Sequence, residues 1–297
     1  MNNNNLKYAK HAVLFLIFAG SFASCKKEDI DPDDFRLVKT LYYDKSTSTT
    51  PTDGIEYLYD QAGNMVKASY FEYIPVTNLH MYREYEYSGN RKIKMKIFGL
   101  DDKEFKMNRY IEYIYDNDQL IREEIKNGYG TLLSSMNYEY SGSNMIREYF
   151  YEPDYGISDE VKYTFDSQNR LIREEYETTN VKDEKYIDHT YDENDRKIKM
   201  VYSNLNGQII KTVMIIYNGR SKLPVKDLHF DSNEIQTSEY QHCYDRKGNL
   251  IETRLVEGCS LFKRKYNSGL LIEEIQYFGK ERNCGEDEVT RYHYEKK

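Results

Sequence analysis

The chain has 297 residues, with 42 lysines and arginines, 50 aspartates and glutamates, and a formal net charge of −8. This acidic balance is not interrupted by a basic stripe, which excludes nucleic acid as the expected partner, because a phosphate backbone would be repelled. The chain holds 31 tyrosines and no tryptophan. Tyrosine together with isoleucine and valine favours half-buried β-strands.

The first 24 residues have the layout of a secretory signal peptide. Lys7 and Lys10 precede an apolar run over residues 12–19, which is shorter than the roughly 20 residues that a membrane-spanning helix needs. Residues 22–25, Phe-Ala-Ser-Cys, resemble a bacterial lipobox, in which the peptide is cut before a cysteine that then carries lipids. We therefore expect residues 1–24 to be removed and Cys25 to be lipidated. An ordinary signal peptide with an incidental cysteine is the alternative.

Residues 25–34 are expected to form an acidic tether behind the lipidated cysteine. Lys26, Lys27, Glu28 and Asp29 resemble the export signal that sends some lipoproteins to the outer face of the Gram-negative outer membrane. A merely solvated charged tether is the alternative. Several acyl chains on one cysteine would anchor the protein stably. The expected location is therefore the outer membrane, through a lipid anchor, on the cell surface.

Residues 35–297 are predicted to be one array of β-hairpins. An aromatic residue ends each first strand, a turn rich in Asp, Asn and Gly follows, and a short apolar-basic strand returns, as in residues 113–122. Such a period indicates a stack of one supersecondary unit. Its register positions, 22 to 28 residues apart, are Tyr59, Tyr87, Tyr115, Tyr140, Phe165, Tyr191, Tyr217, Tyr244, Tyr266 and Tyr294.

The fold class predicted from this period is all-β, with tandem antiparallel hairpins in one continuous twisted meander sheet. Ile55, Tyr57 and Tyr59 share one strand face and Glu56 and Leu58 the other, which predicts an aromatic face and a charged face. Because twist accumulates over many strands, the sheet must coil into an open roll or close into a barrel. A membrane-spanning barrel is not expected, because the charged face would meet lipid.

The recurring Tyr-x-Tyr-Asp-x-x-Gly-x-Leu pattern, seen in residues 57–65 and 243–250, resembles the YD repeat of the RHS family over roughly residues 55–297. The resemblance implies a spiral β-sheet, which in that family encloses a hollow and often a toxin domain. Many units here lack the glycine, and the chain carries neither the RHS core cleavage motif nor a toxin domain after Tyr294. It is more similar to short YD-repeat lipoproteins than to a complete RHS shell.

Three cysteines remain after Cys25. In a hairpin array the Tyr-Asp turns lie at one end of the strands and the longer connections at the other. Cys259 and Cys284 fall in longer connections one hairpin apart, whereas Cys243 precedes a Tyr-Asp turn. Because an exported chain can hold disulfides, we predict a Cys259–Cys284 disulfide and a free Cys243.

The chain shows no motif of a phosphate loop, a nucleophile elbow or a zinc hydrolase. His189 and His242 stand where other units have tyrosine, so they are expected to replace an aromatic residue and not to act as ligands. The acidic turns at residues 116–118 and 192–195 suggest calcium, but the same residues are the best turn formers. We expect no metal, no cofactor and no catalytic activity, and keep a hydrolase as the less favoured alternative.

Aromatic residues near the longer loops are the candidate binding surface. Tyrosine offers a large rigid contact area with a polar hydroxyl, which suits protein or glycan recognition. The alternative is that these residues close the ends of a roll. The expected function is a non-catalytic interaction surface for a protein or glycan. The alternative is a periplasm-facing structural or envelope-assembly role without an external ligand. The candidate residues are Tyr70, Phe71, Tyr73, Tyr149, Phe150, Tyr151 and Tyr155.

Overall fold

The computed structural model describes residues 34–73, 76–101, 103–178, 184–256, 260–278 and 285–297. These residues form β-strands and turns, with no α-helix among them, so the predicted all-β class is confirmed. No helix in this described part of the chain is long and apolar enough to cross a bilayer. All of these residues belong to one structural unit, residues 31–297.

Twenty strands follow one another through the described residues. Their bounds are β1 Phe35–Tyr43, β2 Asp53–Tyr59, β3 Met65–Glu72, β4 Asn78–Ser88, β5 Arg91–Asp101, β6 Glu104–Asp116, β7 Gln119–Asn127, β8 Leu132–Ser141, β9 Asn144–Glu152, β10 Gly156–Phe165, β11 Leu171–Thr178, β12 Tyr186–Tyr191, β13 Lys197–Ser203, β14 Ile209–Tyr217, β15 Pro224–Asp231, β16 Gln236–Tyr244, β17 Leu250–Leu255, β18 Ser260–Asn267, β19 Leu270–Phe278 and β20 Gly285–Lys296.

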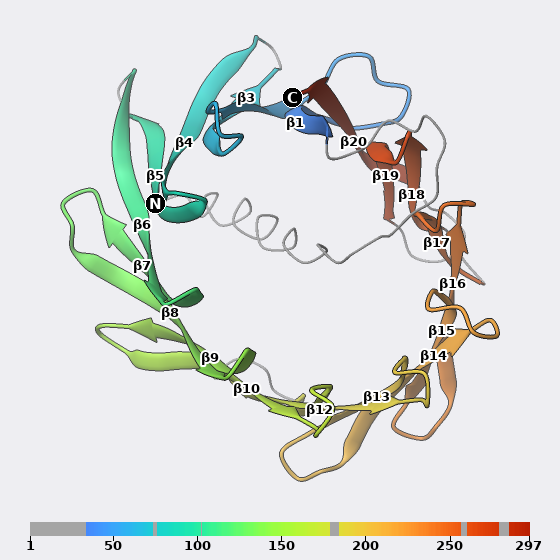
Figure 1. The fold of residues 1–297 in the computed structure, drawn as a ribbon. Helices are drawn as coiled ribbons and strands as arrows, with labels where there is room; N and C mark the ends of the chain where they lie inside the picture. The colour runs from blue at the N-terminus through green and yellow to red at the C-terminus, as the bar shows by residue number, and fades with distance from the viewer. Residues whose placement is uncertain (1–33, 74–75, 102, 179–183, 257–259, 279–284) are drawn as a thin grey trace. The chain divides into compact units, whose positions relative to one another are not determined.

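The strands form a meander that closes into a barrel. Each strand pairs antiparallel with the next along the chain, and β20 pairs antiparallel with β1 from Phe35↔Lys296 to Tyr43↔Val289. Figure 1 shows the strands in a ring, with the C-terminus beside β1. Of the two predicted outcomes, the closed barrel is therefore correct. Closure leaves no free sheet edge, which removes the template for edge-to-edge aggregation.

The first and last strands together form a tenth hairpin. Tyr294 of β20 lies opposite Leu37 of β1, as Tyr59 of β2 lies opposite Met65 of β3. The backbone N–H of Lys297 donates to the carbonyl oxygen of Asp34 at 2.8 Å, in the place of a turn hydrogen bond. The first strand of the barrel is thus a returning strand and the last is an outgoing one.

A β-bulge lies beside the register position of every hairpin, including the one formed by the chain ends. Because a bulge bends its strand and increases the local twist, ten bulges in one ring help the sheet curve into a barrel. The residue left over in the register is always isoleucine or valine: Val38, Val66, Ile93, Ile121, Ile146, Ile172, Ile198, Val225, Ile251 and Ile272.

The short turns lie together at one end of the barrel, as predicted, and an aspartate organises many of them. In the turn after β10 the Asp166 carboxylate accepts the backbone N–H groups of Gln168 and Arg170, at 2.8 and 3.0 Å. Asn169 has φ of 61°, and Gly63 occupies the same turn position with φ of 86°. This left-handed conformation explains why glycine and asparagine recur there.

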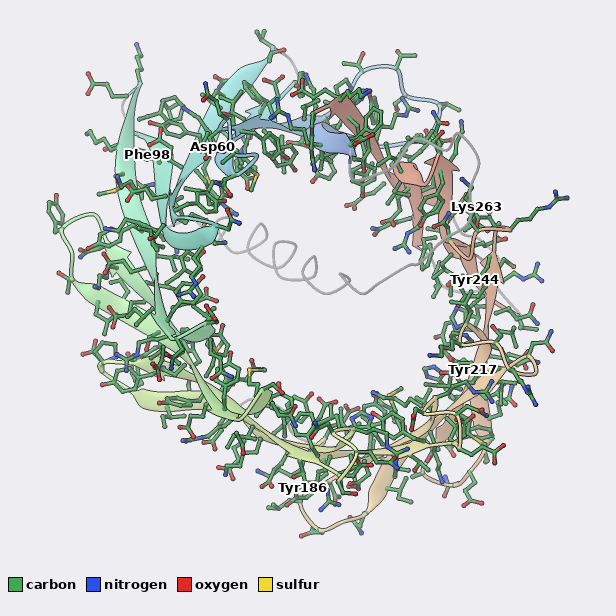
Figure 2. The ribbon with its side chains drawn as sticks, viewed as in Figure 1. Asp60, Phe98, Tyr186, Tyr217, Tyr244 and Lys263 are labelled. Atoms are coloured by element: carbon green, nitrogen blue, oxygen red, sulfur yellow. The ribbon has the colours of Figure 1, made fainter. Side chains whose placement is uncertain are left out.

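The predicted two faces are present throughout the wall. Ile55 lies opposite Tyr70, and Tyr57 lies opposite Ala68, whereas Glu56 lies opposite Ser69. We call these the tyrosine face and the charged face. The tyrosine face is the concave, inner one, and Lys263 of the charged face lies on the outer side of the wall (Figure 2).

The wall is one strand layer thick, so the barrel has little dry core. Among the described residues, the buried apolar side chains are those of Tyr43, Ala68, Met95, Val213 and Val289. Strands about 4.8 Å apart and tilted to the axis give a twenty-stranded barrel a backbone diameter of roughly 40 Å. The described side chains line the wall and do not meet across its centre (Figure 2).

Candidate functional site

The inner wall is the candidate site, and a ladder of tyrosine hydroxyls holds it near the turn end. The hydroxyl of Tyr217 donates to the carbonyl oxygen of Lys197 at 3.0 Å, and Tyr191 bonds Leu171 in the same way at 2.9 Å. In each case an outgoing strand is tied to the preceding returning strand. The same bond links Tyr59 to Leu37, Tyr87 to Met65, Tyr115 to Lys92, Tyr140 to Leu120, Tyr266 to Leu250 and Tyr294 to Leu271.

Deeper in the barrel, four carboxylates each accept a hydrogen bond from an aromatic side chain 15 residues later. We call these four pairs the carboxylate belt. Tyr138 donates to Glu123 at 2.9 Å and Tyr163 donates to Glu148 at 2.6 Å. Burial, together with the neighbouring carboxylates, raises the pKa of both hydroxyls, so they stay protonated and act as donors. The other two pairs are His189–Glu174 and His242–Asp227.

The two histidines of the belt replace tyrosine as hydrogen-bond donors. His189 Nε2 lies 2.8 Å from Glu174, and His242 Nε2 lies 3.0 Å from Asp227. Because a carboxylate only accepts hydrogen bonds, Nε2 is the donor in both pairs. The bond from His189 lowers the pKa of Glu174, to which the Tyr176 hydroxyl also donates. The structure thus places both histidines at tyrosine positions, as the sequence predicted.

On β4 and β5 the inner wall carries two cations. Arg83 of β4 has its guanidinium 5.0 Å from the centre of the Tyr70 ring, and Lys92 of β5 has its Nζ 4.4 Å from that of Tyr113. Burial lowers the pKa of Lys92, and the charge of Arg83 lowers it further. The buried Nε of Arg83 has no hydrogen-bond partner among the described residues.

The outer wall is covered by ion pairs between neighbouring strands. Lys94 and Lys126 lie on either side of Glu112, at 2.8 and 2.6 Å. Arg173 makes two bonds to Asp188, at 2.6 and 2.9 Å. Exposed pairs of this kind each contribute roughly 0–1 kcal/mol, so they determine register and solubility more than stability.

The predicted aromatic surface is divided between the two faces. In the first cluster Tyr70 lies on the inner face, while Phe71 and Tyr73 pack together with ring centres 6.3 Å apart. In the second cluster Tyr149 lies opposite Asn137 on the outer face and Phe150 lies opposite Met136 on the inner face. The two clusters lie on and just beyond β3 and β9, which are not neighbours in the sheet.

The remaining members of the second cluster lie near the longer loops. Tyr151 shares the outer face with Tyr149, opposite Ser135. Tyr155 lies in the connection between β9 and β10 and is 82% exposed. Tyr155 is thus exposed and Tyr151 partly exposed on the outside of the barrel, and their role in binding stays a prediction.

The acidic turns use their carboxylates within the turn. Asp192 accepts backbone N–H groups of Asn194 and Arg196, and its second oxygen accepts the Arg196 guanidinium at 2.7 Å. In the turn after β6, Asp118 instead forms an ion pair with Arg91. Among the described residues no group of three or more His, Cys, Asp or Glu side chains is arranged to hold a metal ion.

Several predicted residues lie outside the described residues. They are Cys25, Lys26, Lys27, Glu28 and Asp29 of the anchor and tether, and Cys259 and Cys284 of the predicted disulfide. Cys243 is described and is a free thiol. The lipid anchor and the Cys259–Cys284 bridge therefore stay predictions.

The acceptors of the carboxylate belt were not among the residues predicted from the sequence. Its signal was present in the chain, since a carboxylate precedes each of the four belt donors by 15 residues, at Glu123, Glu148, Glu174 and Asp227. The cations Arg83 and Lys92 carried no comparable signal, because lysine and arginine recur in strands along the whole sequence.

No protein family matches this sequence, and no curated protein does. Comparison of structures finds the TcdB2-TccC3 crystal structure, at 16% identity and a TM-score of 0.48, over 83% of this chain and 14% of that one. The Photorhabdus luminescens Tc holotoxin pore is found at 10% identity and a TM-score of 0.30, over 81% and 16%. The chain thus spans about one seventh of the length of the toxin-complex chains that it matches.

A porin-like protein from Bacteroides uniformis is also found, at 9% identity and a TM-score of 0.32, over 87% of this chain and 98% of that one. At these identities and TM-scores, the likenesses assign neither a family nor an activity to this chain. The structure itself shows a closed β-barrel with a tyrosine-lined inner wall and an ion-paired outer wall.

Proposed function

We propose that this protein is a non-catalytic binding barrel, held in the outer membrane by lipid on Cys25 and exposed at the cell surface, with a protein or a glycan as its partner. The barrel is a rigid wall with two accessible faces. Its tyrosine hydroxyls offer hydrogen bonds in a fixed geometry at low conformational cost, which suits recognition.

The observation that carries this proposal is that the inner carboxylates are held by neighbouring side chains. Glu148 is bonded by Tyr163, and Glu174 by both His189 and Tyr176. A general acid or base needs a proton-transfer partner in the substrate and a pKa near the working pH. In the belt, the pKa of Glu174 is instead lowered by its partners. Such pairs stabilise a wall and present a polar surface to a ligand.

The outer wall supports an anchor by lipid in place of strands that span the bilayer. Lys94, Glu112 and Arg173 lie on the outer face between the ends of their strands, where a membrane barrel has its apolar band. Charged residues facing lipid at the bilayer midplane cost roughly 2–4 kcal/mol each. We infer that the barrel stands in water beside the membrane and that the lipid on Cys25 supplies the attachment.

Protease shaving of intact cells tests the location. The full chain with a C-terminal tag is compared with a variant in which Lys26, Lys27, Glu28 and Asp29 are all replaced by alanine. We expect external protease to remove the tag from the parent but not from the variant, while both remain in the outer-membrane fraction. Retention of the tag in both proteins, with degradation after the outer membrane is opened, would contradict surface exposure. Loss of both from the membrane fraction would contradict the anchor.

The second candidate function is a structural or envelope-assembly role on the periplasmic side. The ion-paired outer wall favours it in one respect, because such a wall suits close packing against other polar envelope components. Protection of both proteins in the shaving experiment would support this role. Crosslinking in intact cells from the exposed Tyr155 position would then identify the neighbouring component.

A further inference from the structure

Arg83 and Lys92 are cations on the inner wall without a carboxylate at ion-pair distance. On β5, the outer residues Lys94 and Lys96 reach Glu112 and Glu86 at 2.8 and 2.5 Å. Lys92 lies on the inner face of the same strand, and its contacts there are tyrosine rings, with Nζ 4.4 Å from the Tyr113 centre and 5.7 Å from the Tyr85 centre. The described residues therefore neutralise the outer lysines of β5 and leave the inner one without an ion pair.

Arg83 adds a second charge without an ion pair, close enough to Lys92 to act on its pKa. It lies opposite Ile97 on β5, with its guanidinium over the Tyr70 ring at 5.0 Å. Its buried Nε lacks a hydrogen-bond partner among the described residues, and an unsatisfied charged donor is costly to bury. Two neighbouring cations in a partly buried place repel each other, and an anion between them would relieve that repulsion.

The tyrosines around these cations are suited to receive an anion. Burial raises the pKa of four tyrosine hydroxyls near Arg83, that of Tyr85 to about 12, whereas the charge of Arg83 acts to lower them. The four residues are Tyr57, Tyr70, Tyr85 and Tyr113. Protonated hydroxyls donate hydrogen bonds to an oxyanion and to neutral hydroxyl groups alike. The carboxylate that acts to raise the pKa of Lys92 is that of Glu123. This carboxylate already accepts a hydrogen bond from the Tyr138 hydroxyl at 2.9 Å.

We propose that Arg83, Lys92 and the surrounding tyrosine hydroxyls form a binding site for the carboxylate of an acidic sugar residue in a glycan that enters the barrel. The planar guanidinium suits a carboxylate, because its N–H groups match the two oxygens. The tyrosine hydroxyls bond the sugar hydroxyls beside it. This assignment rests on the proposed binding function and specifies the glycan alternative within it.

Calorimetric titration of the full-length protein with hexagalacturonate tests the site. Its methyl ester, which has the same sugar ring without the charge, serves as the neutral probe, and inorganic phosphate as the simple oxyanion. The variants are Arg83→Gln and Lys92→Met. The matched control is Lys67→Met, because Lys67 lies 3.9 Å from the Tyr82 ring centre on the outer face of β3, as Lys92 lies over Tyr113 on the inner face.

We expect the parent and Lys67→Met to bind the acidic oligomer with equal affinity. Arg83→Gln and Lys92→Met should each bind it at least about tenfold more weakly, because each loses a charge-assisted hydrogen bond. The methyl ester should also bind the parent at least about tenfold more weakly. Unchanged circular dichroism and melting would show that the inner variants are folded.

Three results would overturn the assignment. Equal binding of the ester, unaffected by Arg83→Gln and Lys92→Met, would show a neutral-glycan site elsewhere and leave the proposed binding function standing. Phosphate that binds at Arg83 and Lys92 as tightly as the sugar would make this a general oxyanion site. Absence of binding by both oligomers would remove the acidic-glycan assignment. Surface exposure would still be decided independently by the shaving experiment.

Discussion

The backbone N–H of Lys297 donates a hydrogen bond to the carbonyl oxygen of Asp34 at 2.8 Å. This bond joins the last residue of the chain to a residue just before β1, and it lies where the other hairpins have their turn. The barrel is therefore closed by a hairpin made of its first and last strands, β1 and β20. Because its two strands are far apart in sequence, its formation carries the largest loop-closure entropy in the fold.

Closure depends on packing at the contact between β20, β1 and β19. A substitution of Val289 tests this packing. Val289 is 0% exposed and lies opposite Tyr43 on β1 and Ile275 on β19. We expect Val289→Ala to lower the free energy of unfolding by about 1–3 kcal/mol, because it leaves a cavity in one of the few dry places of the wall. Urea unfolding followed by circular dichroism measures this. The matched control is Val76→Ala at a position 72% exposed, and equal effects of the two would contradict the role of Val289.

The hydroxyl ladder should contribute measurably to stability. Tyr217→Phe removes the bond to the Lys197 carbonyl while keeping the ring. We expect a loss of about 0.5–1.5 kcal/mol, the usual net contribution of one hydrogen bond. The control Tyr155→Phe changes a hydroxyl on a side chain that is 82% exposed and should leave the melting temperature unchanged. An unchanged melting temperature in Tyr217→Phe would show that water replaces the bond without cost.

The ladder also predicts a stabilising substitution. Phe165 occupies a register position and has no hydroxyl, while Tyr140, Tyr191 and Tyr217 each reach a carbonyl 20 residues earlier. The equivalent acceptor for a tyrosine at position 165 is the carbonyl oxygen of Met145. We expect Phe165→Tyr to raise the free energy of unfolding by about 0.5–1.5 kcal/mol. A lower melting temperature would mean that the added hydroxyl cannot reach this acceptor.

Acid stability should depend on Glu174. The bond from His189 holds the folded-state pKa of Glu174 below the ordinary value of 4.5. The contribution of this carboxylate to the free energy of unfolding is therefore fully present above that pH. It is lost as pH falls through the folded-state pKa, where the carboxyl group takes up a proton. We expect Glu174→Gln to be less stable than the parent by about 1–3 kcal/mol at pH 7 and to approach it as pH falls below 4.5.

Urea midpoints measured between pH 3 and 7 test this dependence on Glu174. The control is Glu193→Gln in an exposed turn, which should show the same pH dependence as the parent. A difference between Glu174→Gln and the parent that stays constant over this range would contradict the assigned role of the charge.

Alkaline stability should depend on the inner tyrosines. Burial raises the pKa of Tyr42 and Tyr85 to about 12, from 10.0. In the unfolded chain these hydroxyls ionise near pH 10. Their contribution to the free energy of unfolding is therefore complete below that pH and is lost as pH rises through about 12. Absorbance at 295 nm should show one group of tyrosines ionising before unfolding and another ionising with it. Tyr85→Phe should remove one tyrosine from the second group, and its loss from the first group would contradict this assignment.

The cysteines can be assigned by mass spectrometry. Cys243 is a free thiol, and the position of Cys259 and Cys284 in longer connections predicts a disulfide between them. Alkylation of the unreduced, unfolded protein followed by peptide mapping should give one adduct, on Cys243, and a linked peptide pair. Adducts on all three cysteines would show that the bridge does not form.

The sequence by itself determined the hairpins, their turns and the two faces. These features are local: Asp166 bonds its own turn, and Tyr57 and Glu56 point to opposite faces because strand side chains alternate. The same local pattern predicted that His189 and His242 take the places of tyrosines. An array of near-identical units also leaves few alternative pairings, since each strand pairs with its neighbour along the chain.

Only the tertiary structure decided that the sheet closes, because twist summed over twenty strands and the pairing of β20 with β1 depend on every unit at once. It also decided which charges are neutralised. Lys92 and Lys94 are two residues apart and alike in sequence, but bulge placement and curvature put one among tyrosines inside and the other beside Glu112 outside. Pairing across strands therefore determined the candidate site, whereas periodicity within strands determined the barrel wall.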